Sequence, residues 1–522
     1  MLALAAALLA GSASATPPWV NDFALIKRGL DRAVALGRLD GAEAGDYRAT
    51  AARARAALPR LPSSRYRNLA AVVHQVAGFW KGYDGPRGRT LFDMLDFNVR
   101  WFSKHWDQKA GTDALDYSDG TWYRAFPGIG FQFHPLENVG KLNNYVTQKN
   151  ATRAEQLAQA LLDRAVIRAG GLAWEYYFRF AGGRPPWISG MAQAVAAQAL
   201  SRAGSLLADP TLTDAARRVY TTIPLLTRRV QTGPWIRLYA FNNETVLNAQ
   251  LQTIASLQDY ATQTGDQAAS ALASQLQAAA VGLLPRFDTG YWSLYSLGGV
   301  EAPLEYHKLV VRLLQTLSKR TKDAVLTSYA QRFAGDLKEP PVVKAGPGPG
   351  AIYPDPADGY RDYARYTFWV SKRSTVRLVV DHAGKPFAVS RGWHSIVWSP
   401  GRIEPGLYTP GLHAVDVVGN ASDVELPSVE VRRDNQAPQV SASLAGRRLY
   451  WRGTDNASPW LQLRVVLRRS GAVRTVWLGR SPFRGSAVLA VPRGLWSATL
   501  SAADSSGNAT QVSLGLVRGL PG

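Results

Sequence analysis

The pattern of apolar residues changes at Leu337. Before this residue, apolar side chains recur mostly at spacings of three and four residues, as in amphipathic helices. After it come Pro- and Gly-rich stretches at residues 339–341 and 345–350, then short Val- and Thr-rich runs separated by turn signals. A chain of 522 residues is also too long for a single hydrophobic core. We therefore expect a helical domain over residues 16–337, a linker over residues 338–351 and β domains after it.

The helical part reads as a series of helices joined by loops that carry aromatic residues. Residues 152–155 resemble a capping box, and residues 91–102 mix helical and strand periods. Paired helices with ring-bearing loops predict an α/α toroid, in which the loops form a rim and a cleft. An extended α-solenoid is the alternative, although the sequence shows no fixed repeat period. The expected helices cover residues 22–39, 42–58, 63–80, 135–145, 152–169, 188–203, 213–228, 245–262, 266–284, 304–318 and 321–334.

The β part contains an internal repeat. The sequence DVVGNA at residues 416–421 recurs as DSSGNA at residues 504–509. Alternating short runs with turns between them are typical of antiparallel β-sandwiches. We expect two tandem sandwiches, at residues 352–434 and 435–522, which resemble bacterial immunoglobulin-like modules. Neither contains a catalytic pattern, so spacing or sugar binding is the expected role.

The charge of the chain indicates an acidic partner. The formal net charge is +21, which suits nucleic acid, an anionic cell surface or a uronic-acid polysaccharide. The sequence has no compact run of Lys and Arg, no helix-turn-helix pattern and no zinc pattern, so we expect no nucleic acid partner. A soluble, Arg-biased surface also explains the charge.

The absence of cysteine excludes disulfide scaffolds, thiol catalysis and Cys-zinc sites. No cluster of metal ligands and no cofactor motif stands out, so we expect neither a metal nor a cofactor. Residues 1–15 form an apolar run that ends in Ala13-Ser14-Ala15, which fits a signal peptide. We therefore expect a secreted protein, with cell-wall or cell-surface association as one possibility.

Residues 287–309 form an irregular segment between expected helices. This stretch, FDTGYWSLYSLGGVEAPLEYHKL, concentrates Tyr and Trp rings, three carboxylates, one His and several Gly and Pro residues. Binding and catalytic groups often lie on loops of this kind. By itself the stretch favours an aromatic-rich connection between helices that only packs.

Four motifs in the helical half resemble the C-terminal domain of the D-glucuronyl C5-epimerase family. PWISGMAQ at residues 186–193 is similar to the family's PW-[YI]-S-x-MAQG signature, with Ala194 in place of its last Gly. WIRLY at 235–239, followed by VLN at 246–248, resembles the family's WYEEY and VLN block. FDTG at 287–290 and EYH at 305–307 resemble its YDTG and [DE]YH motifs. The resemblance covers about residues 120–337.

The resemblance implies inversion of C5 of a uronic acid within a polysaccharide. The family's catalytic tyrosines would be Tyr239, Tyr295 and Tyr306. Its catalytic Glu falls on Leu238, which is a departure from the family pattern. Removal of the C5 proton adds charge beside the sugar carboxylate, so the site needs a base, an acid and cationic or hydrogen-bonding groups. Carboxylates on neighbouring loops that could replace the missing Glu are Glu175, Glu244, Asp288, Glu301 and Glu305.

Other residues are candidates for substrate binding. Arg184 and Arg237 could clamp the sugar carboxylate, because a guanidinium matches its geometry. His134 and His307 are candidates for acid or base, although a structural role is at least as consistent for a lone His. Asp288 could instead shape its turn. The aromatic rings that could stack on sugars are Trp122, Trp174, Trp187, Trp235 and Trp292.

Two alternatives remain open from the sequence. A polysaccharide lyase abstracts the same proton but then expels the C4 oxygen, and α/α toroids host such enzymes as well. A glycan-binding protein that keeps the cleft without turnover is the other alternative, and Leu238 favours it.

Overall fold

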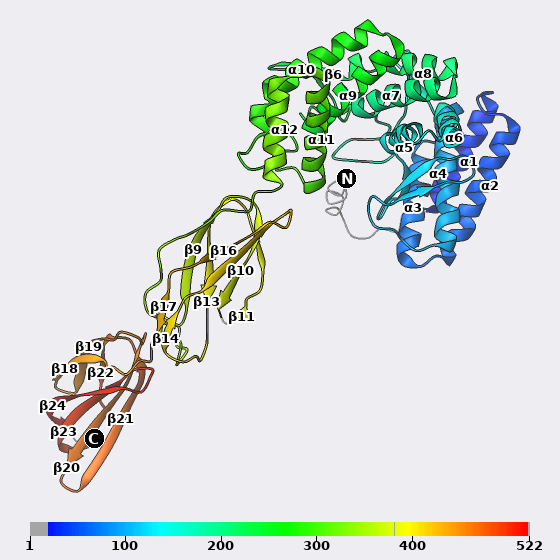
Figure 1. Ribbon diagram of the computed structural model, residues 1–522. Helices are drawn as coiled ribbons and strands as arrows, with labels where there is room; N and C mark the ends of the chain where they lie inside the picture. The colour runs from blue at the N-terminus through cyan, green and yellow to red at the C-terminus, as the bar shows by residue number, and fades with distance from the viewer. Residues whose placement is uncertain (1–18, 381, 520–522) are drawn as a thin grey trace. The chain divides into compact units, whose positions relative to one another are not determined.

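The computed structural model describes residues 19–380 and 382–519, so the predicted signal peptide lies outside the described residues. The chain divides into two compact units between Leu337 and Lys338. The first unit is mainly helical and the second is built from strands (Figure 1). This confirms the expected order of a helical region followed by a strand-rich region. Among the described residues, no helix has the length and apolar character needed to cross a membrane.

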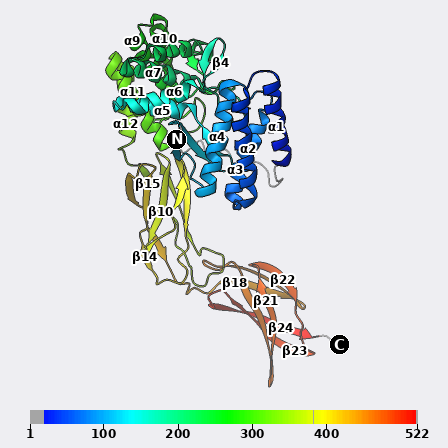
Figure 2. The same ribbon diagram turned by 90° about the vertical axis from the view of Figure 1, so that its right-hand side faces the viewer.

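The helical unit contains two groups of helices. In the first, α1 packs on α2 and α3, and α4 packs on α2 and α3 (Figures 1 and 2). In the second, α5, α7, α9 and α11 form a row in which each helix packs on the next. Helices α6, α8, α10 and α12 pack on members of this row. The helices are α1 (Trp19–Ala35), α2 (Gly41–Ala57), α3 (Ser63–Gly78), α4 (Gly85–Lys104), α5 (Pro135–Thr147), α6 (Ala151–Leu162), α7 (Gly190–Leu207), α8 (Pro210–Tyr220), α9 (Leu247–Thr264), α10 (Gln267–Phe287), α11 (Leu304–Thr321) and α12 (Ala324–Asp336), with short 3₁₀ turns η3 (Leu58–Arg60) and η4 (Pro224–Leu226).

Helix α7 is buried on nearly all sides. Its sequence, GMAQAVAAQALSRAGSLL, consists mostly of small residues, and most of its side chains are inaccessible to solvent. Small side chains allow neighbouring helices to approach on several faces at once. The helix therefore lies within the row, with α5 and α9 beside it and α8 against it.

The structure differs from the sequence-based expectations at several places in the helical unit, of which three are explained by local chemistry. The segment with mixed periods is helical, within α4, and Pro86 lies in its first turn, where a missing N–H costs nothing. The N-cap of α6 is Asn150, which accepts a hydrogen bond from Arg153 N at 3.1 Å, and not Thr152. The predicted helix 213–228 is too long, because α8 ends at Tyr220 and the chain enters a 3₁₀ turn at Pro224.

Short antiparallel strands fill the connections of the helical unit. The strands β1, β2 and β3 form a sheet that packs on α3, α4 and α5. In this sheet Arg124 of β2 lies opposite Asp113 of β1 and Gln132 of β3. The strands of this unit are β1 (Asp113–Leu115), β2 (Trp122–Phe126), β3 (Gly130–Phe133), β4 (Val166–Arg168), β5 (Gly171–Ala173), β6 (Thr227–Val230) and β7 (Gly233–Ile236).

The second unit contains two β modules, each with its own apolar core. In the first module β13, β9 and β8 form one sheet and β11, β10, β15 and β16 another; β12 also pairs with β10, and β14 pairs with β17. In the second, β18, β19 and β22 form one sheet and β21, β20, β23 and β24 the other. The strands are β8 (Val343–Ala345), β9 (Ala364–Val370), β10 (Ser374–Val380), β11 (His382–Ala383), β12 (Phe387–Val389), β13 (Gly392–Trp398), β14 (Gly406–Tyr408), β15 (Gly411–Asp416), β16 (Ala421–Glu425), β17 (Val429–Val431), β18 (Gln439–Ala445), β19 (Arg448–Thr454), β20 (Leu461–Arg469), β21 (Ala472–Ser481), β22 (Arg484–Val488), β23 (Gly494–Ala503) and β24 (Ala509–Gly519).

The repeated DxxGN sequences form the same turn in both modules. Each Asp accepts hydrogen bonds from the backbone N and the side-chain amide of the Asn four residues later. The Gly before each Asn has a positive φ, 107° at Gly419 and 92° at Gly507, a conformation that glycine tolerates best. The sequence repeat is therefore also a repeat in structure.

Candidate functional site

A cavity of about 630 Å³ lies in the helical unit. Residues from α5, α7, α9 and α11 line it, together with β2 and the loops that precede α7, α9 and α11. Its size is typical of a pocket for a small molecule or a short stretch of polymer. Tyr239, Tyr295 and Tyr306, which the sequence places up to 67 positions apart (306 − 239), all contribute to its wall.

The three tyrosines come from different elements. Tyr239 follows β7, Tyr295 lies in the connection between α10 and α11, and Tyr306 is in the first turn of α11. The rings of Tyr295 and Tyr306 meet edge to face, with centroids 5.2 Å apart. The Tyr239 hydroxyl donates a hydrogen bond to the Tyr295 oxygen, which raises the pKa of Tyr239 and lowers that of Tyr295. The tyrosines therefore form one connected group.

Backbone hydrogen bonds hold the loops that carry Tyr239 and Tyr295. The loop before α7 and the loop after β7 are joined by Gly190 N to Arg237 O and by Ala240 N to Ile188 O, both at 3.0 Å. Leu247 N, at the start of α9, donates to Tyr295 O at 3.2 Å. The N-terminal ends of α7 and α9 therefore hold the loops that carry both rings.

Burial determines the protonation of these tyrosines. Loss of solvent raises the pKa of Tyr239, Tyr295 and Tyr306 above the ordinary value of 10. The positive charge of Arg124 acts in the opposite direction and lowers the pKa of Tyr306. All three hydroxyls are thus protonated at neutral pH, and Tyr306 is the one whose anionic form has a nearby cation.

Aromatic rings form one side of the cavity. Trp187 stacks on Tyr176, with ring centroids 4.0 Å apart and planes 2° from parallel, and Tyr239 meets Trp187 edge-on. The indole N–H of Trp187 donates to Phe178 O at 2.8 Å, which fixes the ring. Together with Phe126 and Phe178, these rings present apolar surface to a ligand.

A charged group forms another part of the wall. Arg124 of β2 donates to both carboxylate oxygens of Asp113, at 2.7 and 3.0 Å, and also pairs with Glu137 of α5. Lys141, one turn further along α5, lies 3.3 Å from each of these carboxylates. Arg124, Glu137 and Lys141 line the cavity. Two cations and two carboxylates therefore share one network.

Glu137 is the only carboxylate among the described residues that line the cavity. Burial raises its pKa above the ordinary value, and the neighbouring Asp113 raises it further. Burial acts to raise the pKa of Asp113 as well, but the hydrogen bonds and charge of Arg124, the hydrogen bond with Glu137 and the charge of Lys141 together outweigh it and lower this pKa. Of the two carboxyl groups, Glu137 is therefore the one that holds a proton more readily and faces the cavity.

His134 lies beside this network but is not a cation. Its Nδ1 accepts a hydrogen bond from Glu137 N at 3.2 Å and so caps α5. Burial, assisted by the charge of Arg124, lowers its pKa from 6.5 to about 3. The imidazole lines the cavity in its neutral form.

Several residues that the sequence suggested for substrate binding lie outside the cavity lining. Trp292 stacks on His307 at 3.8 Å, and the two nitrogens of His307 contact Ser293 and Phe333 O. Trp235 is fully buried against Phe287. These rings pack the interior behind the site, so the structure does not bring them to a ligand in the cavity.

The suggested arginine clamps and replacement carboxylates also lie outside the cavity lining. Glu175 is buried in ion pairs with Arg87 and Arg168. Asp288 caps its own turn through Gly290 N at 2.7 Å and pairs with a cation on α12. Those outside the lining are Arg184, Arg237, Glu175, Glu244, Asp288, Glu301 and Glu305, along with Trp122 and Trp174. Among these arginines and carboxylates, Glu244 still acts on the site, because its negative charge raises the pKa of Tyr239 and of Tyr295.

The charged residues of the N-terminal part of the wall and the ring that stacks on Trp187 were not among the sequence candidates. Arg124, Glu137, Lys141 and Tyr176 all line the cavity. A charged residue inside the aromatic strand WYRAF is the signal that could have identified Arg124, because a lone charge in an apolar strand needs a partner. Glu137 and Lys141 carry no such signal, since charges in a helix usually face solvent.

The fold and the cavity describe a helical protein with an aromatic, tyrosine-bearing site. Residues 170–335 match the family model described as the D-glucuronyl C5-epimerase C-terminus, which is the family that the motifs of this segment resemble. The match extends from just before β5 into α12 and includes neither α1–α6 nor the β modules. No curated protein matches the chain.

Solved structures share only limited similarity with the chain. Cellobiose 2-epimerase of Bacillus thermoamylovorans has a TM-score of 0.35 and 11% identity, over 53% of this chain and 75% of that one. An α-mannanase of Bacteroides thetaiotaomicron has a TM-score of 0.32 and 13% identity, over 39% of this chain and 60% of that one. Fibronectin(III)-like modules of Clostridium thermocellum CbhA have a TM-score of 0.16 and 16% identity, over 34% of this chain and 94% of that one. At these TM-scores the similarities carry no argument about this chain.

Proposed function

We propose that this protein is an epimerase that inverts C5 of D-glucuronate residues in an acidic polysaccharide. The observation that carries the proposal is the convergence of Tyr239, Tyr295 and Tyr306 on one cavity that also contains Arg124 and Lys141. The family of residues 170–335 supports the same reaction class. We also infer that the helical unit is an α/α toroid and that the β modules are immunoglobulin-like.

The proposed chemistry needs an acid and a base on opposite faces of the sugar ring. Tyr306 is the candidate base because Arg124 favours its anion; its own hydroxyl proton must first pass to Glu137, the carboxylate of the cavity lining, before Tyr306 takes the C5 proton. The hydrogen-bonded pair of Tyr239 and Tyr295 is the candidate acid, because both hydroxyls keep their protons at neutral pH. Arg124 and Lys141 would stabilise the second negative charge that develops at the substrate carboxylate.

Glu137 is the proposed replacement for the family carboxylate that is missing at Leu238. Both residues line the cavity. Glu137 comes from α5, outside the family-matched segment. Because its pKa is raised, the Glu137 carboxylate can accept a proton near neutral pH and release it again before the next turnover.

A glycan-binding role without turnover is the second candidate, and Leu238 is the observation that favours it. Leu238 is buried in the cavity wall and presents an apolar surface at the position of the family's carboxylate. Under this alternative the aromatic rings bind sugar, and the tyrosines only donate hydrogen bonds.

The acidic polysaccharide, the export of the chain and an association with the cell surface are parts of the same proposal. The apolar residues 1–15 and the net charge of +21 support export and an anionic partner.

One experiment separates the candidates. The full chain is incubated with glucuronate polymers in deuterated water, and deuterium at C5 and near-ultraviolet absorbance of unsaturated uronate are measured. Deuterium without absorbance supports the epimerase, and absorbance shows a lyase. Polymer binding with neither signal shows the glycan-binding protein and overturns the proposed activity.

A further inference from the structure

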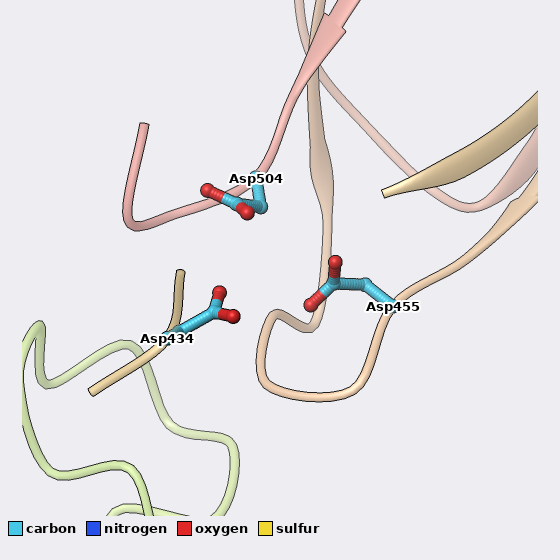
Figure 3. Close-up of side chains that lie close together, drawn as sticks. All are labelled: Asp434, Asp455 and Asp504. Carbon is cyan, nitrogen blue, oxygen red and sulfur yellow. The ribbon is translucent and has the colours of Figure 1, made fainter. Parts of the chain in front are cut away.

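Three aspartates of the second β module converge on one point, although they are far apart in the sequence. Asp434 lies in the connection between β17 and β18, Asp455 directly follows β19, and Asp504 directly follows β23. One carboxylate oxygen from each lies within 4.8 Å of the other two. Figure 3 shows the three carboxylates turned toward one another.

Two of these carboxylates have an oxygen without a hydrogen-bond partner. Asp434 is 9% exposed, and its Oδ2 is buried without a partner among the described residues. Its Oδ1 accepts from Gln436 N at 3.2 Å. Asp455 is arranged in the same way, because Oδ1 accepts from Ala457 N and Ser458 N while Oδ2 is buried and unpaired. A buried carboxylate oxygen with no donor is costly unless a ligand satisfies it.

The charges around the cluster are not balanced by the described side chains. No Lys, Arg or His of the described residues forms an ion pair with Asp434, Asp455 or Asp504 within 4.0 Å. The guanidinium of Arg361 donates to the backbone oxygen of Asn456 at 3.2 Å. The cluster therefore holds excess negative charge.

In the first β module, the Asp that corresponds to Asp504 is paired with a cation. Asp416, which begins its DxxGN turn, pairs with Lys372 Nζ at 3.4 Å, and both side chains are almost fully buried. The same Nζ donates to Glu339 O at 2.6 Å, in the segment that leads into β8. An ammonium group thus joins the turn to the incoming segment.

The strand order identifies the equivalent positions in the second module. Strands β9 and β10 of the first module correspond to β19 and β20 of the second, because each pair occupies the same places in its two sheets. Lys372 lies in the connection between β9 and β10, and Asp455 lies in the connection between β19 and β20. Asp504 corresponds to Asp416. At this place the second module has a carboxylate where the first has a cation.

We propose that Asp434, Asp455 and Asp504 bind a divalent cation of the Ca²⁺ class, which takes the role that the Lys372 ammonium has in the first module. Ca²⁺ binds carboxylate oxygens at about 2.3–2.6 Å, so ligands on opposite sides of the ion can be about 4.6–5.2 Å apart. Mg²⁺ requires about 2.0–2.1 Å and strict octahedral geometry, which favours shorter separations. Water would complete the coordination of an ion held by three side chains.

The test measures Ca²⁺ binding to the full chain after treatment with a chelator. Isothermal titration with CaCl₂ should show one Ca²⁺ per chain and weaker binding of Mg²⁺. Thermal unfolding should show an increase of about 5 °C or more in the Tm of the β unit at Ca²⁺ a hundredfold above Kd. Asp455→Asn keeps the acceptor for Ala457 N but removes a charge, so we expect at least a tenfold weaker Kd. Glu425→Gln, an exposed acid of the first module, is the matched control and should bind as the unmodified chain does.

A charge-reversal variant distinguishes a metal site from a site of general structural importance. Asp455→Lys introduces the ammonium that the first module has at this position. We expect this variant to unfold at a higher temperature than the unmodified chain without Ca²⁺, and to lose its response to Ca²⁺. The proposal is overturned if the unmodified chain shows neither binding heat nor a Tm shift with millimolar CaCl₂, or if Asp455→Asn binds Ca²⁺ as tightly as the Glu425→Gln control.

Discussion

The two walls of the cavity differ in the chemistry they contribute. The family-matched wall, from residues 170–335, supplies Tyr239, Tyr295, Tyr306 and the aromatic rings around Trp187, with one cation, Arg202. The N-terminal wall, from residues 111–144, supplies Arg124, Glu137 and Lys141. The tyrosines therefore come from one part of the chain, and the cations Arg124 and Lys141, together with the carboxylate of Glu137, come from another. The segment that matches the family model therefore does not contain the whole candidate site.

The largest expected loss of activity comes from a substitution on the family-matched wall. Tyr306→Phe removes the hydroxyl that Arg124 favours as an anion, and the rate of deuterium incorporation at C5 should fall by about 10²–10⁴-fold. Polymer affinity, measured by calorimetry, should change little because the ring remains. Glu305→Gln is the matched control, since Glu305 is exposed, lies outside the cavity and pairs only locally with Lys308. Equal exchange rates for the two variants would remove Tyr306 from the mechanism.

A smaller loss of activity is expected from a substitution on the N-terminal wall. Glu137→Gln should lower the exchange rate by about 10²-fold. In the unmodified chain, activity should rise with pH through the raised pKa of Glu137, because the base must be deprotonated, and the variant should lose this limb of the profile.

A second substitution, added to Glu137→Gln, tests whether a carboxylate on the family-matched wall can do the work of Glu137. Leu238→Glu returns a carboxylate to the family-matched wall and should restore part of the activity of Glu137→Gln. If the double variant is no more active than Glu137→Gln alone, Glu137 does not replace the family's carboxylate.

Arg124→Lys should have a smaller effect, of about tenfold in kcat/KM, because it keeps the positive charge but loses the paired donors to Asp113. The loss should appear mainly in KM for the acidic polymer. A neutral polymer with reduced carboxyl groups serves as the comparison, and its binding should be the same in both proteins. A similar loss of affinity for the neutral polymer would assign Arg124 a purely structural role.

The smallest expected effect concerns stability and His134. Its folded pKa of about 3 lies below the ordinary 6.5, so the unfolded chain binds a proton that the folded chain does not. Stability should therefore fall as the pH is lowered from about 6.5 toward 3, by up to about 1.4 kcal/mol per pH unit from this group. His134→Asn keeps an acceptor for the α5 cap and should show a shallower slope in urea unfolding at several pH values. An unchanged slope would show that His134 is not the group responsible.

Local patterns in the sequence predict much of the fold. The three- and four-residue periods identify most of the helices, and the change at Leu337 coincides with the division between the two units. The sequence period does not assign residues 91–102, because α4 packs against other helices and against β3, so its apolar residues are not confined to one face. Tertiary contacts, rather than intrinsic period, determine such a helix.

The sequence predicts only those residues of the candidate site that lie in recognisable motifs. Tyr239, Tyr295 and Tyr306 follow from short family motifs, and the structure places all three on the cavity. Arg124 and Glu137 come from a strand and a helix outside those motifs, so only the packing of β2 and α5 brings them to the cavity. The aspartate cluster was missed for the same reason, because no ligand spacing links Asp434, Asp455 and Asp504 in the sequence.

The backbone bonds between the tyrosine loops and the inner helices have a consequence for heat inactivation. Because Gly190 N and Ala240 N tie the loops before α7 and after β7 together, and Leu247 N holds Tyr295 O, these loops cannot melt independently of α7 and α9. We expect catalytic half-life and helical signal to decay together on heating. If the proposed polymer binds in this cavity, the site is already formed, and the residence time of the polymer should depend on ring stacking and ionic strength rather than on loop opening.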